Sequence, residues 1–248
     1  SVENPLLYYE NNIAALVYLL QELQQKDAAS FIFSSSCTVY GQAEKMPITE
    51  DAPVQQPMSP YGNTKKVGEE IIRDTAKASS INAILLRYFN PIGAHPTAEI
   101  GELPIGVPQN LVPFITQTAI GLRQELSVFG DDYPTPDGTA VRDYIHVVDL
   151  AKAHVIALER LLEKKNTDRV ETFNLGTGTG SSVLEVIQSF ERVSGQKLPY
   201  KIVPRREGDV TEAYANTHKA NTVLGWKAES TLDEAMASAW KWEQKIRS

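Results

Sequence analysis

Apolar residues recur at two different spacings in the first part of the chain. Between Asn12 and Leu23 they fall at positions 13, 16, 17, 20 and 23, which is the spacing of one face of an α-helix. Short apolar runs follow within 30–36 and 83–90, and each segment ends in polar side chains. Such runs are typical of buried parallel strands. The alternation of helix and strand predicts an α/β fold with a doubly wound parallel sheet.

A Tyr-x-x-x-Lys pair stands at the start of a second predicted helix. Ser59 is a good N-cap residue, and Pro60 suits the first helical position. Tyr61 and Lys65 would therefore lie one turn apart on the same helix face. A phenol with a pKa of about 10 is a poor base at neutral pH, and a nearby ammonium favours its phenolate form. We expect Lys65 to lower the pKa of Tyr61 in this way.

Ser36 ends the strand before this helix, in the sequence SSSCTVYG. In open α/β sheets ligands bind beyond the carboxyl ends of the strands. A serine hydroxyl at that edge could orient or relay the proton of a substrate hydroxyl. Ser36, Tyr61 and Lys65 are therefore the predicted catalytic residues.

The stretch 90–110 is the strongest break in the chain. Seven of its 21 residues are proline or glycine, a density that excludes a continuous helix or a central strand. We interpret it as the crossover from the first sheet into a smaller α/β domain that binds the substrate.

A glycine-rich loop at 174–182 looks like a dinucleotide-binding turn but has a different spacing. Its glycines run G-x-G-x-G rather than G-x-G-x-x-G, so we interpret the loop as structural. Its last residue, Ser182, is predicted to form a capping box with Glu185 at the start of the next helix. Thr231 and Glu234 predict the same arrangement for the last helix.

Composition narrows the class of ligand. The 248 residues carry a net charge of −7, which argues against nucleic-acid binding, so an anionic ligand would need locally placed arginines. No uncharged apolar run approaches the roughly 18 residues that span a bilayer, so no membrane partner is expected. The single cysteine, Cys37, predicts a reducing, cytoplasmic location, and the four scattered histidines predict no metal site.

Six segments carry a family resemblance. They are, in order, SSSCTVYG, SPYGNTK, LLRYFNPIGAHP, GTAVRDYIHVVDLA, FNLGTGTGSSVLEV and PRREGD. With them the chain resembles the UDP-glucose 4-epimerases, a family of extended short-chain dehydrogenases/reductases, from Asn11 to about Trp242. The resemblance implies reversible epimerisation of UDP-glucose and UDP-galactose at C4, through a transient 4-keto sugar and bound NAD.

The resemblance also implies a Rossmann-type sheet that is incomplete at its N-terminus. Nothing before Ser34 supplies the G-x-x-G-x-x-G turn with which the family opens, so we expect a fragment that lacks roughly the first quarter of a full-length relative. Residues 1–90 would form the C-terminal half of the NAD-binding domain. Residues 91–248 would form mainly the UDP-sugar-binding domain, with segments that return to the first.

The family pattern assigns roles to particular residues of this sequence. Those expected to contact NAD are Asn11, Ser34, Ser36, Tyr61, Lys65, Tyr88 and Phe89. Those expected to contact the UDP-hexose are Ser36, Asn90, Asn110, Leu111, Ser127, Phe129, Arg142, Tyr144, Arg206, Asp209 and Ala213. Among these, Arg142 and Arg206 would bind phosphate and Asp209 a ribose hydroxyl. The family often forms homodimers, which is the expectation here.

Three alternatives remain at this stage. A nucleotide-sugar 4,6-dehydratase would carry an Asp-Glu pair directly after the strand-end hydroxyl, where this chain has Cys37 and Thr38. The sequence favours the hexose enzyme only weakly over a UDP-pentose or UDP-uronate 4-epimerase, which is the second alternative. A non-catalytic fragment is the third. Ala213 bears on the sugar, because relatives restricted to glucose and galactose tend to carry tyrosine there. A small residue predicts that UDP-GlcNAc and UDP-GalNAc are also accepted.

Overall fold

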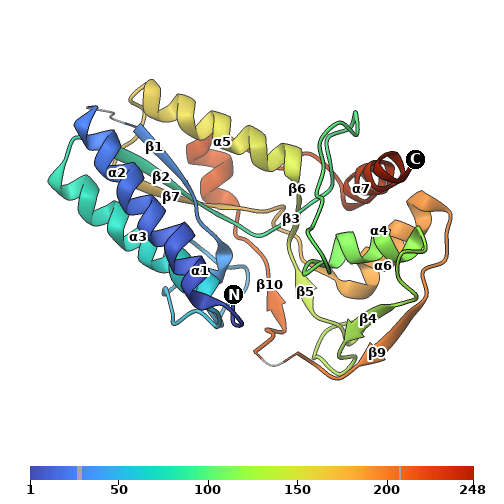
Figure 1. The fold of residues 1–248 in the computed structure, drawn as a ribbon. Helices are drawn as coiled ribbons and strands as arrows, with labels where there is room; N and C mark the ends of the chain where they lie inside the picture. Colours follow the sequence, from blue (N-terminus) through green and yellow to red (C-terminus); the bar gives the residue numbers. More distant parts are fainter. Residues whose placement is uncertain (27–29, 207) are drawn as a thin grey trace. The chain divides into compact units, whose positions relative to one another are not determined.

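The computed structural model describes residues 1–26, 30–206 and 208–248, and the chain divides into two compact units (Figure 1). Unit 1 consists of Ser1–Phe89, Lys152–Leu175 and Ala215–Lys227. Unit 2 consists of Asn90–Ala151, Gly176–Tyr214 and Ala228–Ser248. The assignment of NAD to one domain and of the UDP-sugar to the other stays a prediction.

Unit 1 contains the predicted parallel sheet. Its strands, in spatial order, are β1 (Ser30–Ser34), β2 (Asn82–Tyr88) and β7 (Val170–Leu175). All pairs are parallel, so the three carboxyl ends lie at one edge of the sheet. The α/β class and the strands predicted at 30–36 and 83–90 are confirmed.

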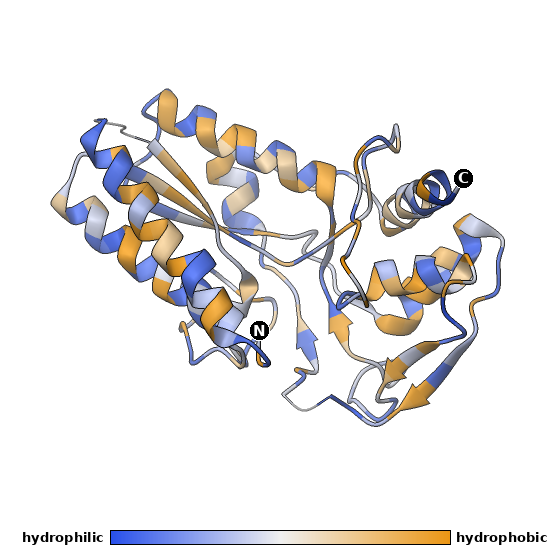
Figure 2. Ribbon diagram, viewed as in Figure 1, coloured by the Kyte–Doolittle hydropathy of each residue, from blue (hydrophilic) through white to orange (hydrophobic). Residues whose placement is uncertain are grey.

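Two helices that run side by side in Figure 1, α2 (Ala15–Gln25) and α3 (Pro60–Ala78), pack on this sheet. Their buried residues meet the strand side chains in one apolar cluster, which contains Leu16, Leu20, Ile72, Ala83 and Leu85. Figure 2 shows hydrophobic and hydrophilic residues alternating around these helices, as expected where one face is buried.

The helix predicted at Asn12 to Leu23 begins earlier than the apolar spacing indicated. It starts with α1 (Pro5–Tyr9), which is capped by the Asn4 side chain, and passes through a π-helical turn η1 (Glu10–Ala14) into α2. A π-turn adds one residue to a turn and thereby shifts which side chains face the neighbouring helix. Asn12 Nδ2 accordingly donates a hydrogen bond of 2.9 Å to Thr64 Oγ1 on α3.

Unit 2 is built from short strand pairs and helices. The pairs are β3 (Asn90–Ile92) with β6 (Tyr144–His146), β4 (Leu126–Phe129) with β9 (Tyr200–Val203), and β5 (Val141–Arg142) between β8 (Ser181–Ser182) and β10 (Glu212–Ala213). The helices α4 (Leu111–Ala119), α6 (Val183–Ser194) and α7 (Leu232–Arg247) enclose the core, and α5 (Val147–Leu162) passes on into unit 1.

The core of unit 2 centres on Phe190 of α6 and Trp240 of α7, whose rings meet edge to face at 5.5 Å. Both predicted capping boxes are present. Ser182 accepts a hydrogen bond from the Glu185 amide, Thr231 accepts one from the Glu234 amide, and each glutamate bonds back to its N-cap amide. These caps hold the first turns of α6 and α7. An N-cap typically contributes about 1 kcal/mol to stability.

Candidate active site

Tyr61, the predicted catalytic tyrosine, lies in the first turn of α3. The Ser59 side chain caps this helix by accepting from the Gly62 amide at 3.2 Å, and proline occupies the first helical position, as predicted. Tyr61 is hydrogen-bonded to the side chains of Ser36 and Tyr88. The ring of Tyr8 meets the Tyr61 ring edge to face, with 6.3 Å between the ring centroids. Tyr8 was not among the predicted site residues.

Ser36 is buried at the end of β1 and serves as the N-cap of a 3-10 turn, η2 (Cys37–Tyr40). Its Oγ accepts from the Thr38 amide at 3.2 Å and from the Thr38 hydroxyl at 3.0 Å. A hydroxyl has two acceptor sites and one donor, so the proton of Ser36 is directed to Tyr61. The bond lowers the pKa of Tyr61, which is the effect of a donor on a phenolate.

Lys65 lies on the same face of α3, one turn after Tyr61. Its Nζ donates to the Ser34 carbonyl at 2.9 Å and lies 5.6 Å from the centroid of the Tyr61 ring. The Ser34 hydroxyl is in turn hydrogen-bonded to His154 Nε2 at 2.8 Å. His154 belongs to α5, far from Ser34 in the sequence, so the local motif could not predict this contact.

The prediction that Lys65 lowers the pKa of Tyr61 is wrong for this arrangement. Burial is the largest effect on Tyr61 and raises the pKa of its phenol well above the usual value, and the neighbouring Tyr88 raises it further. Burial also lowers the pKa of Lys65. Tyr61 is therefore a neutral phenol at pH 7, and it needs a further positive charge close by to act as a base.

The remaining predicted NAD residues have different surroundings. Tyr88 bonds to Tyr61 as described, whereas Phe89 is buried and its amide donates to the Leu175 carbonyl at 3.0 Å. Asn11 lies in the π-turn, and its side-chain amide donates to the Leu7 carbonyl at 2.8 Å. The contacts of these residues with NAD stay predictions.

Unit 2 contains a cavity of about 410 Å³. Most of the residues predicted to contact the UDP-hexose line it, namely Asn90, Asn110, Leu111, Ser127, Phe129, Arg142, Tyr144, Arg206 and Asp209. Segments that are far apart in the sequence thus meet at one place. The lining also includes Glu102, Gln109 and Phe114, which the sequence did not single out.

Two arginines bring positive charge to this cavity, and Glu102 and Asp209 bring negative charge. Arg142 forms a short ion pair with Asp209 and donates to the carbonyls of Val141 and Val210 at 2.7 and 2.8 Å. The guanidinium of Arg206 instead stacks on the ring of Phe129, 3.9 Å from its centroid. Stacking holds the plane of the guanidinium and leaves its N–H edge directed outward, where oxygen acceptors bind.

The amino end of α4 also opens on the cavity, since Asn110, Leu111 and Val112 line it. The N-cap residue Asn110 makes no side-chain cap bond, and its side-chain Nδ2 donates instead to Glu102 Oε1 at 3.0 Å. The first amides of a helix that are not capped by a side chain can bind an anion.

Ala213 lies in β10, where it pairs with Arg142 of β5 and is partly exposed. It is not among the residues found to line the cavity within the part of unit 2 that the structure describes. Its neighbour Tyr214 packs on Gly180, where an added Cβ would come within 3.2 Å of the tyrosine ring. Tyr214 is thereby held against the loop.

The glycine-rich loop is structural, as predicted. Asp143 accepts from the amides of Thr177 and Gly178 at 2.8 and 3.1 Å and from the Thr177 hydroxyl at 2.8 Å. The amides that a phosphate would need are already bonded to a buried carboxylate. In residues 1–26, 30–206 and 208–248 no group of His, Cys, Asp and Glu side chains could hold a metal ion, and no helix of this described part is long and apolar enough to cross a membrane.

Known proteins similar to this chain share nearly its whole length. A family model described as GDP-mannose 4,6 dehydratase matches residues 1–239. The UDP-glucose 4-epimerases of Mus musculus and Bacillus subtilis are each 50% identical, over 99% and 98% of this chain and 70% and 71% of their own. The chain belongs to the UDP-glucose 4-epimerase family. The family model carries the name of a dehydratase, but Cys37 and Thr38 supply no carboxylate pair for eliminating water.

Solved structures of this epimerase family have the same fold. The enzyme of Stenotrophomonas maltophila, determined with NAD and formylated UDP-arabinopyranose, is 48% identical with a TM-score of 0.96, covering 100% of this chain and 73% of that one. The enzyme of Bifidobacterium longum, determined with NAD+ and UDP, is 47% identical with a TM-score of 0.92 over the same shares. The prediction of a Rossmann-type fold in the extended short-chain dehydrogenase/reductase family is confirmed.

Proposed function

We propose that this chain interconverts UDP-glucose and UDP-galactose by inverting C4 of the sugar, with NAD as the cofactor. The observation that carries the proposal is the buried Tyr61 phenol with Ser36 and Tyr88 as hydrogen-bond partners and Lys65 one turn away, in a chain 50% identical to curated UDP-glucose 4-epimerases. A buried phenol and hydroxyl, without a metal ligand or carboxylate pair, suit oxidation and reduction of an alcohol.

The donor set of unit 1 fits the ribose and nicotinamide of NAD. An ammonium has three N–H donors, and the Ser34 carbonyl takes one of those of Lys65, so two remain for ribose hydroxyls. When bound, NAD supplies the hydride acceptor and donor and a positively charged ring. A positive charge is what Tyr61 needs, because burial keeps its phenol neutral.

Proton transfer is the task of Tyr61 and Ser36. As phenolate, Tyr61 takes the proton of the sugar 4-hydroxyl while C4 gives up a hydride, which leaves a 4-keto sugar. Ser36 donates to the Tyr61 oxygen and stabilises its charge. Once the keto sugar has presented its other face and regained the hydride, Tyr61 returns the proton to O4. The same groups thus serve both directions of the reaction.

The UDP moiety fits the cavity of unit 2. A diphosphate carries about two negative charges, which the outward edge of Arg206 and the α4 amides can bind. Asp209, oriented by Arg142, can accept from ribose hydroxyls. With a net charge of −7 on the chain, these local groups must provide the attraction. Firm binding of UDP lets the sugar turn without leaving.

Substitution of Tyr61 by Phe is expected to reduce kcat by about 10²- to 10⁴-fold and to leave UDP affinity within about twofold, because it removes only the proton acceptor. Turnover of UDP-galactose and calorimetric binding of UDP measure the two effects. Tyr200→Phe, on the exposed strand β9, is the matched control and should retain activity. Near-normal turnover of the Tyr61→Phe protein would refute the assignment.

Substitution of Arg206 by Ala is expected to weaken UDP binding about 10- to 100-fold. A charge-assisted hydrogen bond contributes about 1.5–3 kcal/mol, and each 1.4 kcal/mol is about tenfold in affinity. Calorimetry with UDP measures this without turnover. Arg192→Ala removes an exposed arginine, paired with Asp233, and should change nothing. Equal UDP affinity of both variants would show that Arg206 does not bind the diphosphate.

The acetamido sugars UDP-GlcNAc and UDP-GalNAc are further substrates on this account, since the side chain of Ala213 is small. The packing of Tyr214 on Gly180 supports the choice of Ala213, rather than its neighbour, as the residue that limits the sugar. Ala213→Tyr should abolish turnover of the acetamido pair and keep that of UDP-glucose and UDP-galactose. Failure of the unaltered chain to turn over UDP-GlcNAc would end this idea.

The proposal extends to a homodimeric assembly and a cytoplasmic location. A homodimer is supported by exposed apolar side chains on α1 and α2, among them Leu6 and Tyr18. Sedimentation equilibrium should then give twice the chain mass of 27.4 kDa, and a monomer mass would contradict it. A cytoplasmic location is supported by the lone cysteine Cys37, and cell fractionation tests it.

A further inference from the structure

A buried polar network joins the segments that carry the reactive groups of unit 1. Its centre is Glu69 of α3, whose Oε1 accepts from the Ser35 hydroxyl at 2.5 Å and from Arg87 Nε at 2.8 Å. Glu69 Oε2 accepts from Arg87 Nη2 at 2.6 Å. Ser35, Glu69 and Arg87 are each at most 4% exposed. We call these three residues, with Tyr40 and Asn174, the Glu69 network.

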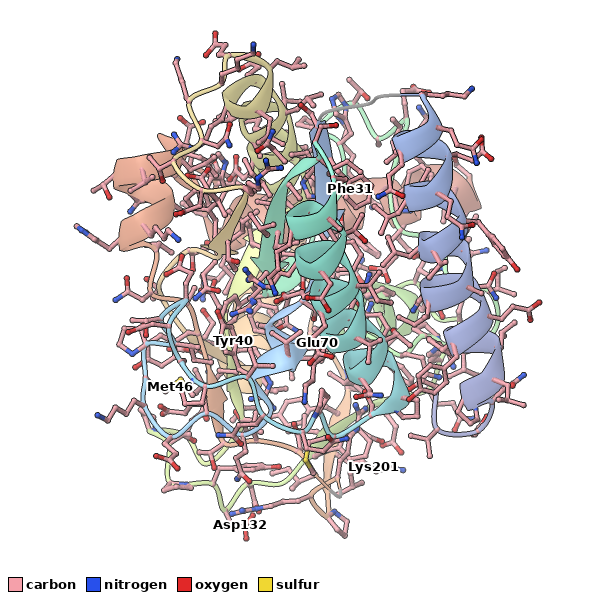
Figure 3. All side chains as sticks on the ribbon, turned by 90° about the vertical axis from the view of Figure 1, so that its left-hand side faces the viewer. Phe31, Tyr40, Met46, Glu70, Asp132 and Lys201 are labelled. Atoms are coloured by element: carbon pink, nitrogen blue, oxygen red, sulfur yellow. The ribbon has the colours of Figure 1, made fainter. Side chains whose placement is uncertain are left out.

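The network continues from Arg87 to the strand β7. Arg87 Nη1 donates to the Tyr40 hydroxyl at 2.9 Å, and the Tyr40 hydroxyl donates to Asn174 Oδ1 at 2.7 Å. The Asn174 amide group reaches on to the Ile48 carbonyl at 2.9 Å. Figure 3 shows Tyr40 beside α3, the helix on which Glu70 is labelled. The bonds thus span β1, the η2 turn, α3, β2 and β7.

Each of Ser35, Glu69 and Arg87 lies within four residues of a proposed reactive group. Ser35 directly precedes Ser36, and Arg87 directly precedes Tyr88. Glu69 follows Lys65 by four residues, so it lies one turn farther along the helix face that carries Tyr61 and Lys65. A displacement of any one segment would therefore both break a bond of the network and move either Tyr61 itself or a side chain that bonds it.

We propose that Glu69 is a positioning residue for the reaction: through Ser35 and Arg87 it sets Ser36, Lys65 and Tyr88 in register around Tyr61. The inference rests on the proposed function. A buried ion pair adds little to stability compared with apolar groups of the same size, but its directional bonds tolerate only one register. Misplacement of a catalytic group by about 1 Å is enough to cost about a hundredfold in rate.

The test is Ser35→Ala, which cuts the link between Glu69 and the strand end beside Ser36. A matched control exists in unit 2, where the buried Ser189 hydroxyl donates to Asp233 Oδ1, also at 2.5 Å. Both variants lose the same kind of bond, so their thermal stabilities should fall similarly. Ser35→Ala alone should show faster amide hydrogen exchange over 35–41 and a kcat about ten- to a hundredfold lower, with the KM for UDP-galactose within about twofold.

A second variant guards against a purely structural effect. Glu69→Met with Arg87→Met removes both buried charges together, so no unpaired charge is left and the protein should fold. It too should lose kcat and keep KM. A folded double variant with unaltered kcat, or a kcat of Ser35→Ala equal to that of Ser189→Ala, would overturn the proposal.

Hydrogen exchange separates this inference from the proposed function. If the unaltered chain turned over no UDP-sugar, the proposed function would fail, and exchange would still decide the role of the network. Faster exchange at 35–41 in Ser35→Ala than in Ser189→Ala supports the positioning of the strand end. Equal exchange in the two variants overturns it.

Discussion

The ion pair between Glu69 and Arg87 is the interaction that ties helix α3 to strand β2 in unit 1. Two charges that are nearly excluded from water are tolerated only when their donors and acceptors are matched. Here Arg87 reaches Glu69 through two bonds and Tyr40 through a third, and Ser35 takes a further site on the carboxylate. This requirement links strand ends and helix α3 through directional bonds, whereas the hydrophobic effect is non-directional.

Burial also decides the electrostatics around Tyr61. Burial of the phenol is the largest effect on its pKa and raises it, although the ammonium of Lys65 lies 5.6 Å from the centroid of the ring. In unit 2 the charges are arranged differently, because Arg142 is already balanced by Asp209 and Arg206 rests on an aromatic ring.

Local sequence patterns were sufficient for the parts that depend on near neighbours. The caps of α3, α6 and α7 follow from short motifs and the strands β1 and β2 from apolar runs, and all are confirmed. The π-turn at Glu10–Ala14 was not foreseen, because its polar residues fit a regular helix equally well. The two-residue strands of unit 2 carry too few positions to show any period.

The site was predictable only where a motif or the family resemblance marked it. Three contacts of unit 1 join residues that no sequence motif connects. They are Tyr8 with Tyr61, His154 with Ser34, and Glu69 with Ser35. The effect of Lys65 on Tyr61 was misjudged because the depth of burial is a property of the folded chain. The cavity of unit 2 is lined by residues between 90 and 209. Because they are far apart in the sequence, only the family resemblance could assign them to one site.

The most direct test of the account follows the hydrogen at C4. UDP-galactose that carries deuterium at C4 is incubated with the chain and NAD in ordinary water, and the UDP-glucose formed is examined by NMR. Since the hydrogen leaves and returns as a hydride, which does not exchange with solvent, the account predicts that the deuterium stays at C4. Product with solvent hydrogen at C4 would contradict it, because the reaction would then proceed by proton abstraction from carbon.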